Sequence, residues 1–536
     1  MFVDARELPP GTILQADIAI IGAGPAGITI ARDLIQSNLR VIVLEGGGLE
    51  MESESQALYE GGNVGHRYLP LQALRSRYFG GSSNCWGGWC RPFDPIDFEK
   101  RDWVPYSGWP FGKEELDPYY ERARVLCGLS TDNFSVEFWE SRLNDPRLKY
   151  IRIPDDRVVS RMAQLSQAPR FGIAYGDELR AAKNVTVYLH ANVLEVEVND
   201  SASAVTGLRT APLPGHEFRV TARRYVLATG GIENARMLLL SNRVAKAGLG
   251  NQHDLVGRFF MEHPDVRVSR IVPKDRTTPL NLYDIQYAFF TAGSAAYLAL
   301  RDEVLRDERL LNYQGWLIAV NRGEVSKGGD ALKNLFRAFM KPTFPDHFID
   351  KSASFWFRNL GNALLDLPNT AVVAIGRLSK SPWFVKEYQF AHYCEPTPNP
   401  DSRITLDSAK DRFGLNRARL DWQLSPADMH TMRRAQEIIA EEIARAGFGS
   451  VEDEISQDGI EELNNSSWGW HQMGTTRMHE NPKRGVVDAD CRIHGLSNLY
   501  VAGSSVFPTG GSNLPTMTIV ALALRLAGHL RRVFDS

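Results

Sequence analysis

The chain has 536 residues, 43% of them hydrophobic and 23% charged, with a formal net charge of −3. This composition is typical of a globular protein, and the length exceeds what one simple core needs, so two domains are expected. A nearly balanced charge with scattered basic residues gives no electrostatic reason to expect nucleic acid or an anionic membrane as a partner.

The first elements form one βαβ unit. Residues 17–21 are a short apolar, β-branched run, which is typical of a buried parallel strand. A glycine turn follows, residues 26–35 carry apolar side chains at helical spacing, and residues 40–44 are the second strand. A strand, a turn, a helix and a second strand at the start of a chain indicate a nucleotide-binding sheet.

The same order of strand, glycines and helix returns later in the chain. Strand-like runs lie at 193–198 and 224–229, and the second leads into Gly230, Gly231 and an apolar helix at 235–240. A further strand at 499–502 precedes a glycine-rich loop and a helix from about 516 to 530. We therefore expect both ends of the chain to contribute to one sheet, with a second domain inserted between them.

The middle of the chain has a different character. Residues 270–395 are rich in aromatic and polar residues, and residues 401–406 and 418–423 resemble antiparallel strands. Ser425 then caps a helix that runs to about residue 446. The predicted fold is α/β, a Rossmann-like dinucleotide-binding domain with an inserted α+β substrate domain on an antiparallel sheet. The expected dinucleotide-binding domain comprises 1–95, 185–265 and 463–536, and the substrate domain comprises 96–184 and 266–462.

Three glycines in the first turn carry the earliest chemical signal. Gly22, Gly24 and Gly27 form GxGxxG between a strand and a helix. They permit a tight turn, close approach to a pyrophosphate and close helix–strand packing, with the helix N-terminus facing the phosphates. Glu45 ends the second strand, where a carboxylate accepts hydrogen bonds from ribose hydroxyls. This pattern predicts a dinucleotide site and leaves NAD and FAD both open.

The cysteines and the N-terminus concern the compartment. The five cysteines are an odd number without a CxxC pair, which favours reduced thiols over disulfides or a zinc site. The N-terminus has no apolar stretch of signal-peptide length, and no window approaches the roughly 20 apolar residues of a membrane span. We expect a cytoplasmic protein without a metal site or a membrane partner, and the sequence does not reveal its oligomeric state.

Three longer motifs identify a family. They are GGSSNCWGG at 80–88, ATGGIENAR at 228–236, and HQMGTTRM from His471 followed by the stretch that contains GGSNLPTMT. Together with the first fingerprint, these motifs resemble the glucose–methanol–choline (GMC) oxidoreductases, in the order that the family shows and over most of the chain. The segment HQMGTTRM and an asparagine in GGSNLPT look closest to the branch of pyranose oxidases and glycoside 3-oxidases.

The resemblance implies FAD as the cofactor. In pyranose 2-oxidases a histidine in the glycine-rich segment tethers FAD covalently, and Cys85 occupies the matching position here, so non-covalent FAD is expected. Val193 would bind adenine through its backbone, and Gly503 and Ser504 would lie near the ribityl and pyrophosphate groups. The full set of residues expected to bind FAD is Gly22, Gly24, Pro25, Ala26, Gly27, Glu45, Gly46, Gly81, Ser82, Ser83, Asn84, Cys85, Val193, Ala228, Gly230, Gly503, Ser504, Asn513 and Thr516.

The resemblance also implies the chemistry. An alcohol gives up hydride readily only as its hydroxyl proton departs, and histidine suits the base because its ordinary pKa lies near neutrality. His471 is the expected base, and Asn513 is expected to hold the substrate oxygen against flavin N5. His263 is interpreted as structural, and His479 and His494 as surface or packing residues.

The predicted function is FAD-dependent oxidation of a secondary alcohol of a sugar or glycoside, with C3 of a glucoside as one candidate position. One alternative is a dehydrogenase of another polyol or aromatic alcohol. An alternative of a different class is a flavin-binding protein that only relays electrons. Oxygen and a quinone-like acceptor are both open as electron acceptors. Tyr287, Trp316, Trp356 and Trp383 are candidates for stacking on a sugar, and Gln389 and His392 for binding its hydroxyls.

Overall fold

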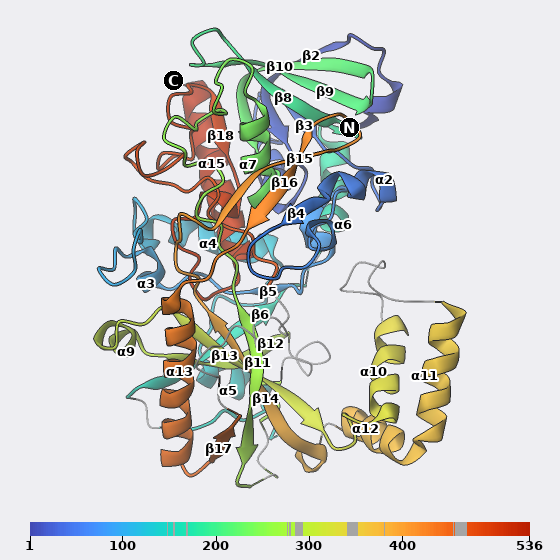
Figure 1. Ribbon diagram of the computed structural model, residues 1–536, viewed down its shortest axis with the longest axis vertical. Helices are drawn as coiled ribbons and strands as arrows, with labels where there is room; N and C mark the ends of the chain where they lie inside the picture. The colour runs from blue at the N-terminus through green and yellow to red at the C-terminus, as the bar shows by residue number, and fades with distance from the viewer. Residues whose placement is uncertain are drawn as a thin grey trace.

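The computed structural model describes residues 1–146, 148–153, 156–167, 170–275, 277, 280–284, 293–339, 352–379, 381–453, 455 and 469–535. Figure 1 shows a nucleotide-binding part built on one sheet at the top and an antiparallel sheet below it. Helices accompany both sheets. The architecture is the expected mixture of a parallel α/β layer and an antiparallel α+β layer.

In the described part of the chain the first sheet has eight strands, and its parallel half follows the predicted βαβ unit. β2 pairs in parallel with β3 on one side and with β10 on the other. The buried residues of β2 and β3 form a nearly continuous apolar run. Such a run is expected for parallel strands whose two faces are both covered by helices. The strands in spatial order are β1 (Phe2–Asp4), β7 (Val185–Leu189), β3 (Val41–Leu44), β2 (Ile13–Ile21), β10 (His216–Leu227), β9 (Val205–Leu213) and β8 (Asn192–Val198), with β18 (Leu499–Val501) also paired to β10.

Strand β10 joins the two ends of the chain. Its first half pairs with β9 in antiparallel register, from His216 opposite Leu213 to Val220 opposite Leu208. Its last residues, Tyr225–Leu227, pair in parallel with β18 from the C-terminal part of the chain. The expectation that both ends contribute to one sheet is therefore confirmed.

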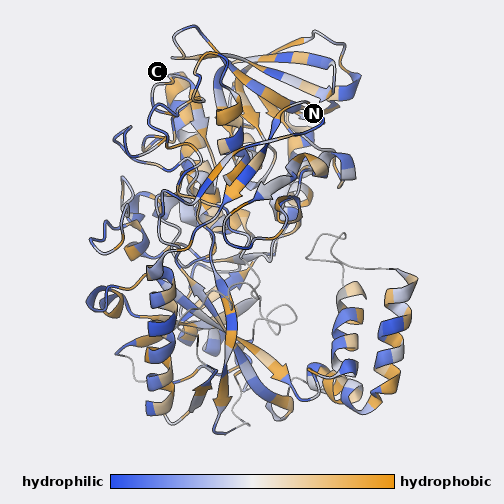
Figure 2. Ribbon diagram, viewed as in Figure 1, coloured by the Kyte–Doolittle hydropathy of each residue, from blue (hydrophilic) through white to orange (hydrophobic). Residues whose placement is uncertain are grey.

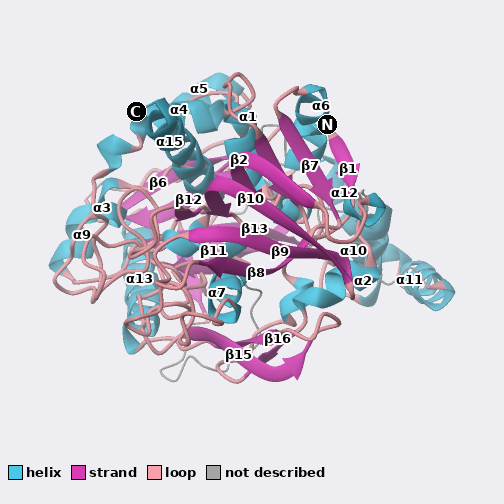
Figure 3. Ribbon diagram, turned by 90° about the horizontal axis from the view of Figure 1, so that it is seen from above, coloured by secondary structure: helices cyan, strands magenta, loops and turns pink. Residues whose placement is uncertain are grey.

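Helices cover the two faces of this sheet. Figure 3 shows α1 (Pro25–Asp33) and α15 (Thr516–Asp535) on one side and α7 (Gly230–Leu240) on the other. α4 (Asp117–Leu126) packs on α15, and α6 (Phe171–Ala181) packs on α1. Each of α1, α7 and α15 begins directly after the loop at the carboxyl end of a parallel strand. Their N-termini therefore meet at one edge of the sheet, where a ligand binds in such folds.

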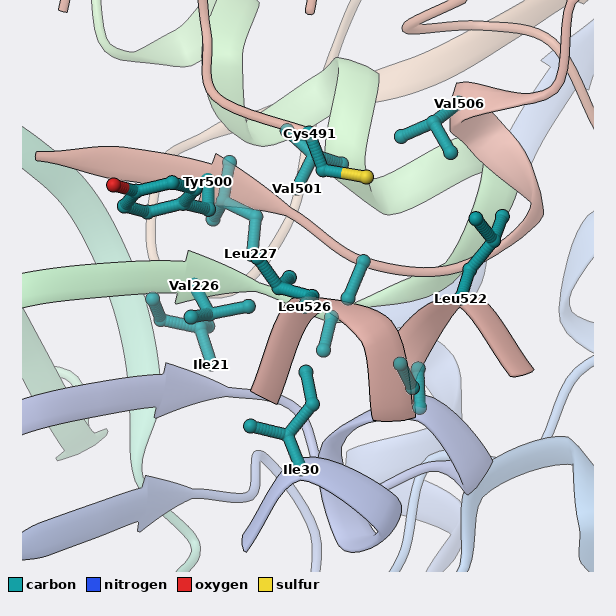
Figure 4. Close-up of a cluster of buried hydrophobic side chains, with 14 of the residues drawn as sticks. Ile21, Ile30, Val226, Leu227, Cys491, Tyr500, Val501, Val506, Leu522 and Leu526 are labelled. Carbon is teal, nitrogen blue, oxygen red and sulfur yellow. The ribbon is translucent and has the colours of Figure 1, made fainter. Parts of the chain in front are cut away.

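The core of this part lies between the sheet and α1 and α15. Fully buried aliphatic side chains of strands β2, β10 and β18 contact those of the two helices. Burial of apolar surface stabilises the folded state by about 25 cal/mol per Å². This cluster therefore holds in place the strand ends that carry the binding loops. Figure 4 shows Ile21, Ile30, Val226, Leu227, Cys491, Tyr500, Val501, Val506, Leu522 and Leu526 in this cluster.

The second sheet is antiparallel, with seven strands among the residues that the structure describes. Helix α13 (Pro426–Arg445) covers one of its faces, and its N-terminus has the predicted cap, with Ser425 and Asp428 in a capping box. A separate core of buried apolar side chains joins α13 to the strands. The strands in order are β17 (Gly449–Glu452), β11 (Asp265–Pro273), β14 (Val385–Cys394), β13 (Tyr313–Asn321), β12 (Ser294–Leu300), β6 (Val158–Leu165) and β5 (Trp89–Cys90).

Three helices between β13 and β14 form an arm that stands away from the sheet (Figure 1). They are α10 (Lys327–Phe339), α11 (Ala353–Leu365) and α12 (Leu367–Ser379). Figure 2 shows apolar segments on these helices, and Phe357, Leu365 and Leu378 are each about four-fifths exposed or more. None of the helices in the described part of the chain is long and apolar enough to cross a membrane.

A small third sheet links distant segments. β15 (Arg403–Lys410) and β16 (Asn416–Asp421) form the expected antiparallel pair, and β16 also pairs in parallel with β4 (Gly61–Asn63). This sheet packs on α7 of the nucleotide-binding part. The predicted domain boundaries stay a prediction. The remaining α-helices of the described residues are α2 (Ser53–Gln56), α3 (Pro95–Phe98), α5 (Val136–Leu143) and α9 (Asp302–Asp307).

Candidate active site

A cavity of roughly 740 Å³ lies at the carboxyl edge of the parallel strands. Its walls come from the first glycine turn, the loop after β3, the loop at 81–89, the start of β8 and the loops before α7 and α15. The predicted FAD-binding residues that line it are Gly22, Gly24, Pro25, Ala26, Glu45, Gly46, Gly81, Ser82, Ser83, Cys85, Val193, Ala228, Gly230, Gly503, Ser504 and Thr516.

Three helix N-termini face this cavity. Pro25 and Ala26 of α1, Gly230 of α7 and Thr516 of α15 are first-turn residues, and all of them line the wall. The first backbone N–H groups of a helix lack partners within the helix and carry partial positive charge. The cavity is therefore suited to an anionic group such as a diphosphate.

The glycines act in the way that their positions in the motif predict. Gly22 has φ +103°, and a Cβ there would lie 2.6 Å from the carbonyl oxygen of Ala228. A Cβ on Gly27 would lie 2.0 Å from the carbonyl oxygen of Gly22, so Gly27 permits close packing and does not itself line the cavity. Gly230 and Gly503 have positive φ and open space where a Cβ would stand. At these two positions a side chain would occupy the cavity.

The buried carboxylate of Glu45 organises the loops around the cavity. Its two oxygens accept hydrogen bonds from the backbone N–H groups of Ala23, at 3.0 Å, and Gly47, at 2.9 Å. A carboxylate has further lone pairs, so these bonds leave acceptor capacity for ribose hydroxyls. Glu45 thus lies where the sequence predicts, and its hydrogen bonds also join the loop after β2 to the loop after β3.

A second acidic group on the wall was not predicted as a site residue. Glu233 on α7 lies 2.9 Å from Arg75 and 3.1 Å from Arg236, and Arg236 also contacts Asp411. Burial alone would raise the pKa of Glu233, but the coulombic effect of Arg236, Arg75 and Arg77 lowers it to about 2. The carboxylate is therefore ionised and held by its partners.

The loop at 80–88 presents Cys85 to the cavity. Its Sγ lies 3.4 Å from the carbonyl oxygen of Ser82, and burial raises the pKa of the thiol. A thiol that stays protonated is a poor nucleophile, which favours the predicted non-covalent attachment of FAD. Asn84 does not line the cavity, because its amide donates to the carbonyl oxygen of Phe79 and stabilises the loop itself.

These residues fit FAD. One cavity combines three features. It has glycines where a side chain would fill the space, three helix N-termini that suit a diphosphate, and a carboxylate at the end of β3. Val193 on β8 also lines it, beside a register shift between Val193 and Glu195. The described chain therefore contains the groups that a flavin dinucleotide requires along its length.

His471 lies on the wall of the same cavity. Its backbone N–H donates to the Glu262 carboxylate at 2.6 Å, and its ring Nδ1 lies 2.9 Å from Nδ1 of His263. Burial and the neighbouring His263 hold the pKa of His471 well below its ordinary value. At neutral pH the imidazole is therefore unprotonated at one nitrogen, which a general base requires.

The structure does not support the role expected for Asn513. The residue is fully buried and does not line the cavity. Its Oδ1 accepts from Tyr297 at 3.0 Å and Gln314 at 2.5 Å, while its Nδ2 donates to Asp94 at 2.9 Å and to the carbonyl oxygen of Pro92 at 3.2 Å. With both amide atoms engaged by the protein, Asn513 holds the loop, and its neighbour Leu514 lines the cavity instead.

Several residues of the cavity wall were not predicted from the sequence. Trp470 lines the cavity with φ +63°, a left-handed conformation that is rare for a bulky residue and is often found at functional sites. A Cβ on Gly469 would lie 2.7 Å from Nδ1 of His471, so glycine is needed there. Arg267 and Tyr393 also line the cavity, and both bond the carboxylate of Asp265.

The other candidates for sugar binding lie away from the cavity wall. Trp316 is buried against Trp89 and Tyr297. Trp356 is half-buried on α11, Trp383 is exposed beneath Arg322, and Tyr287 lies outside the described residues. Neither Gln389 nor His392 lines the cavity, and His392 is buried between Tyr313, at 2.6 Å, and Ser269, at 3.0 Å. His479 and His494 hold local loops, as expected.

Comparisons with known proteins agree with this geometry. The family described as GMC oxidoreductase matches residues 398–523, and the family described as FAD dependent oxidoreductase matches residues 17–246. Among solved structures, formate oxidase has a TM-score of 0.57 at 17% identity and covers 98% of this chain and 100% of its own, which shows the shared fold.

Three curated relatives align with nearly the whole chain. A 2-methyl-1,2-propanediol dehydrogenase of Mycolicibacterium austroafricanum is 25% identical over 97% of this chain and 96% of its own length. A paromamine 6'-oxidase of Streptomyces fradiae is 25% identical over 95% and 90%. A C-glycoside 3-oxidase of Microbacterium trichothecenolyticum is 23% identical over 96% and 96%. The chain is a member of the GMC oxidoreductases and an FAD-dependent enzyme that oxidises CH–OH groups.

Proposed function

We propose that this enzyme oxidises a secondary hydroxyl of a sugar or glycoside to a ketone, with His471 as the base. The observation that carries the proposal is the position of the His471 imidazole on the wall of the cavity that fits FAD, where burial and His263 hold its pKa low. When bound, FAD supplies the hydride acceptor. His471 accepts the hydroxyl proton, and the bond from its backbone N–H to Glu262 holds it in place.

The wall near His471 supports a polyhydroxylated substrate. Strand β11 begins two residues after His263, and its first residue, Asp265, lies opposite Tyr393 of β14. Arg267 on the same strand and Tyr393 both line the cavity. The Arg267 guanidinium is fixed on Asp265 at 2.9 Å and remains about one-third exposed. A fixed guanidinium and a phenol, with Trp89 and Trp470 also on the wall, offer polar groups and aromatic faces of the kind that bind sugars.

C3 of a glucoside is our first candidate for the oxidised carbon, since the C-glycoside 3-oxidase aligns over almost the full chain. A small polyol is the second candidate, since the 2-methyl-1,2-propanediol dehydrogenase aligns equally fully. We propose oxygen or a quinone as the electron acceptor. A role as an electron relay is disfavoured, because a neutral base on the wall has no function in a relay.

Anaerobic reduction of the holoenzyme distinguishes these candidates. Methyl β-glucoside, its 3-deoxy analogue and 2-methyl-1,2-propanediol are mixed separately with the enzyme, and the oxidised flavin band is followed. Bleaching by the glucoside alone, with a 3-keto product in the NMR spectrum, supports the proposal. Faster bleaching by the diol, or equal bleaching by the 3-deoxy sugar, would overturn the sugar or the C3 assignment respectively. Reoxidation of the bleached enzyme by air or by a quinone then identifies the acceptor.

A further inference from the structure

His263 and His471 form a chain of two imidazoles that ends on a backbone carbonyl. Their Nδ1 atoms lie 2.9 Å apart, and Nε2 of His263 lies 2.6 Å from the carbonyl oxygen of Gly511. The two rings are nearly perpendicular, at 85°. His263 is 1% exposed. The ring of His263 is therefore shielded from solvent, and its two nitrogens contact His471 and the carbonyl oxygen of Gly511.

The carbonyl of Gly511 determines where the protons lie. A carbonyl oxygen only accepts, so Nε2 of His263 carries a proton. Burial lowers the pKa of His263 to about 4, so the ring is neutral at neutral pH and its Nδ1 bears a lone pair. The short contact between the two Nδ1 atoms then requires a proton on Nδ1 of His471. Because His471 is neutral as well, its Nε2 bears the free lone pair.

We infer that His263 is a positioning residue that selects the tautomer of His471 in which Nε2 is the base. This inference rests on the proposed role of His471. When the substrate hydroxyl gives its proton to Nε2, the Nδ1 proton stays in its hydrogen bond to His263, and that bond strengthens as the ring becomes positive. No further proton needs to move, and His263 remains neutral throughout.

The backbone supports the same pair of rings. Met261 and Met473 form an isolated antiparallel bridge that brings the two histidine segments together. The Glu262 carboxylate accepts from the backbone N–H groups of both His263, at 3.1 Å, and His471, at 2.6 Å. Burial raises the pKa of Glu262 to about 7. Glu262 therefore titrates near neutral pH beside both histidine backbones, and Glu395 also acts electrostatically on His263. The titration of Glu262 has to be separated from that of His471.

Two substitutions separate the tautomer role from packing. His263→Leu keeps a comparable volume but offers no acceptor to Nδ1 of His471. His263→Asn places a side-chain oxygen close to the original Nδ1 position. We expect His263→Leu to slow anaerobic flavin reduction at saturating alcohol about 10- to 100-fold, as loss of a group that orients a histidine does, with unchanged substrate affinity. His263→Asn should restore most of the rate. The acid limb of the pH profile should also shift in His263→Leu, because the ring that influences the pKa of His471 is lost, and it should return in His263→Asn.

The tautomer itself is measured in the wild-type holoenzyme, so the test does not depend on a variant that folds. Histidine labelled with ¹⁵N gives distinct nitrogen shifts for the two tautomers, and the His471 signals are those missing in His471→Ala. A proton on Nδ1 of His471 supports the inference. A proton on Nε2, or a His263→Leu enzyme with wild-type rate and pH profile, would overturn it. If His471→Ala reduces its flavin at the wild-type rate, the proposed function fails and the inference fails with it.

Discussion

Replacement of His471 by alanine removes the only free base that the described cavity wall offers to an alcohol. The three carboxylates of that wall are held by protein groups: Glu45 by two backbone N–H groups, Glu233 by Arg75 and Arg236, and Asp411 by Arg236. A positioned general base contributes about 10²- to 10⁴-fold to a rate. With no substitute nearby we expect the upper part of that range, a loss of about 10³- to 10⁴-fold, or about 4 to 5.5 kcal/mol in the barrier.

Anaerobic stopped-flow measurement of flavin reduction isolates this step from reoxidation. His471→Ala should retain FAD, because the diphosphate-binding N-termini are untouched, and its residual rate should rise with hydroxide concentration. His479→Ala is the matched control. It alters another histidine of the same motif, which lies outside the cavity and accepts a hydrogen bond from the backbone of Asn481. A His471→Ala rate within tenfold of the wild type would refute the assignment of the base.

Four further results are expected. The fall in the rate of flavin reduction that belongs to His471 should lie below pH 6.5, because the pKa of His471 is lowered and its neutral form is the active one; a limb above pH 6.5 that persists in Glu262→Gln would contradict this. Gly503→Val should purify with little flavin, since its side chain would enter the cavity, whereas Gly215→Ala, at a positive-φ turn outside the cavity, should keep its flavin. Gly469→Ala should keep FAD but reduce it at least about tenfold more slowly, because its Cβ would lie 2.7 Å from Nδ1 of His471. Acid precipitation should release FAD equally from wild type and Cys85→Ser; flavin left on the wild-type protein alone would show a cysteinyl link.

The nucleotide-binding half of the fold could be predicted because its signals are local. The glycine turn, the apolar runs on either side and the acid at the end of the second strand all lie between residues 13 and 45. Strand lengths were less predictable. β2 begins at Ile13, four residues before the predicted strand, because Ile13–Ala16 pair with Arg219–Ala222 of β10. Such an extension depends on a partner some 200 residues away, which a local pattern does not contain.

The orientation of site residues could be predicted only where the backbone dictates it. The cradle residues are placed by helix starts and glycine turns, and most of them line the cavity. The contacts of Asn513 could not be predicted, because Asp94, Tyr297 and Gln314 come from three other segments and all hydrogen-bond to its amide. His263 was interpreted as structural, and its contact with His471 arises from a bridge between segments more than 200 residues apart. The motif MEHPD contains no sign of that contact.

The most direct test of the account is a stoichiometric anaerobic titration of the holoenzyme with methyl β-glucoside. We expect each equivalent of glucoside to bleach one equivalent of enzyme-bound FAD and to yield one equivalent of a keto glucoside. A flavin band that no alcohol bleaches, although dithionite does, would contradict the central claim that this cavity and His471 oxidise an alcohol.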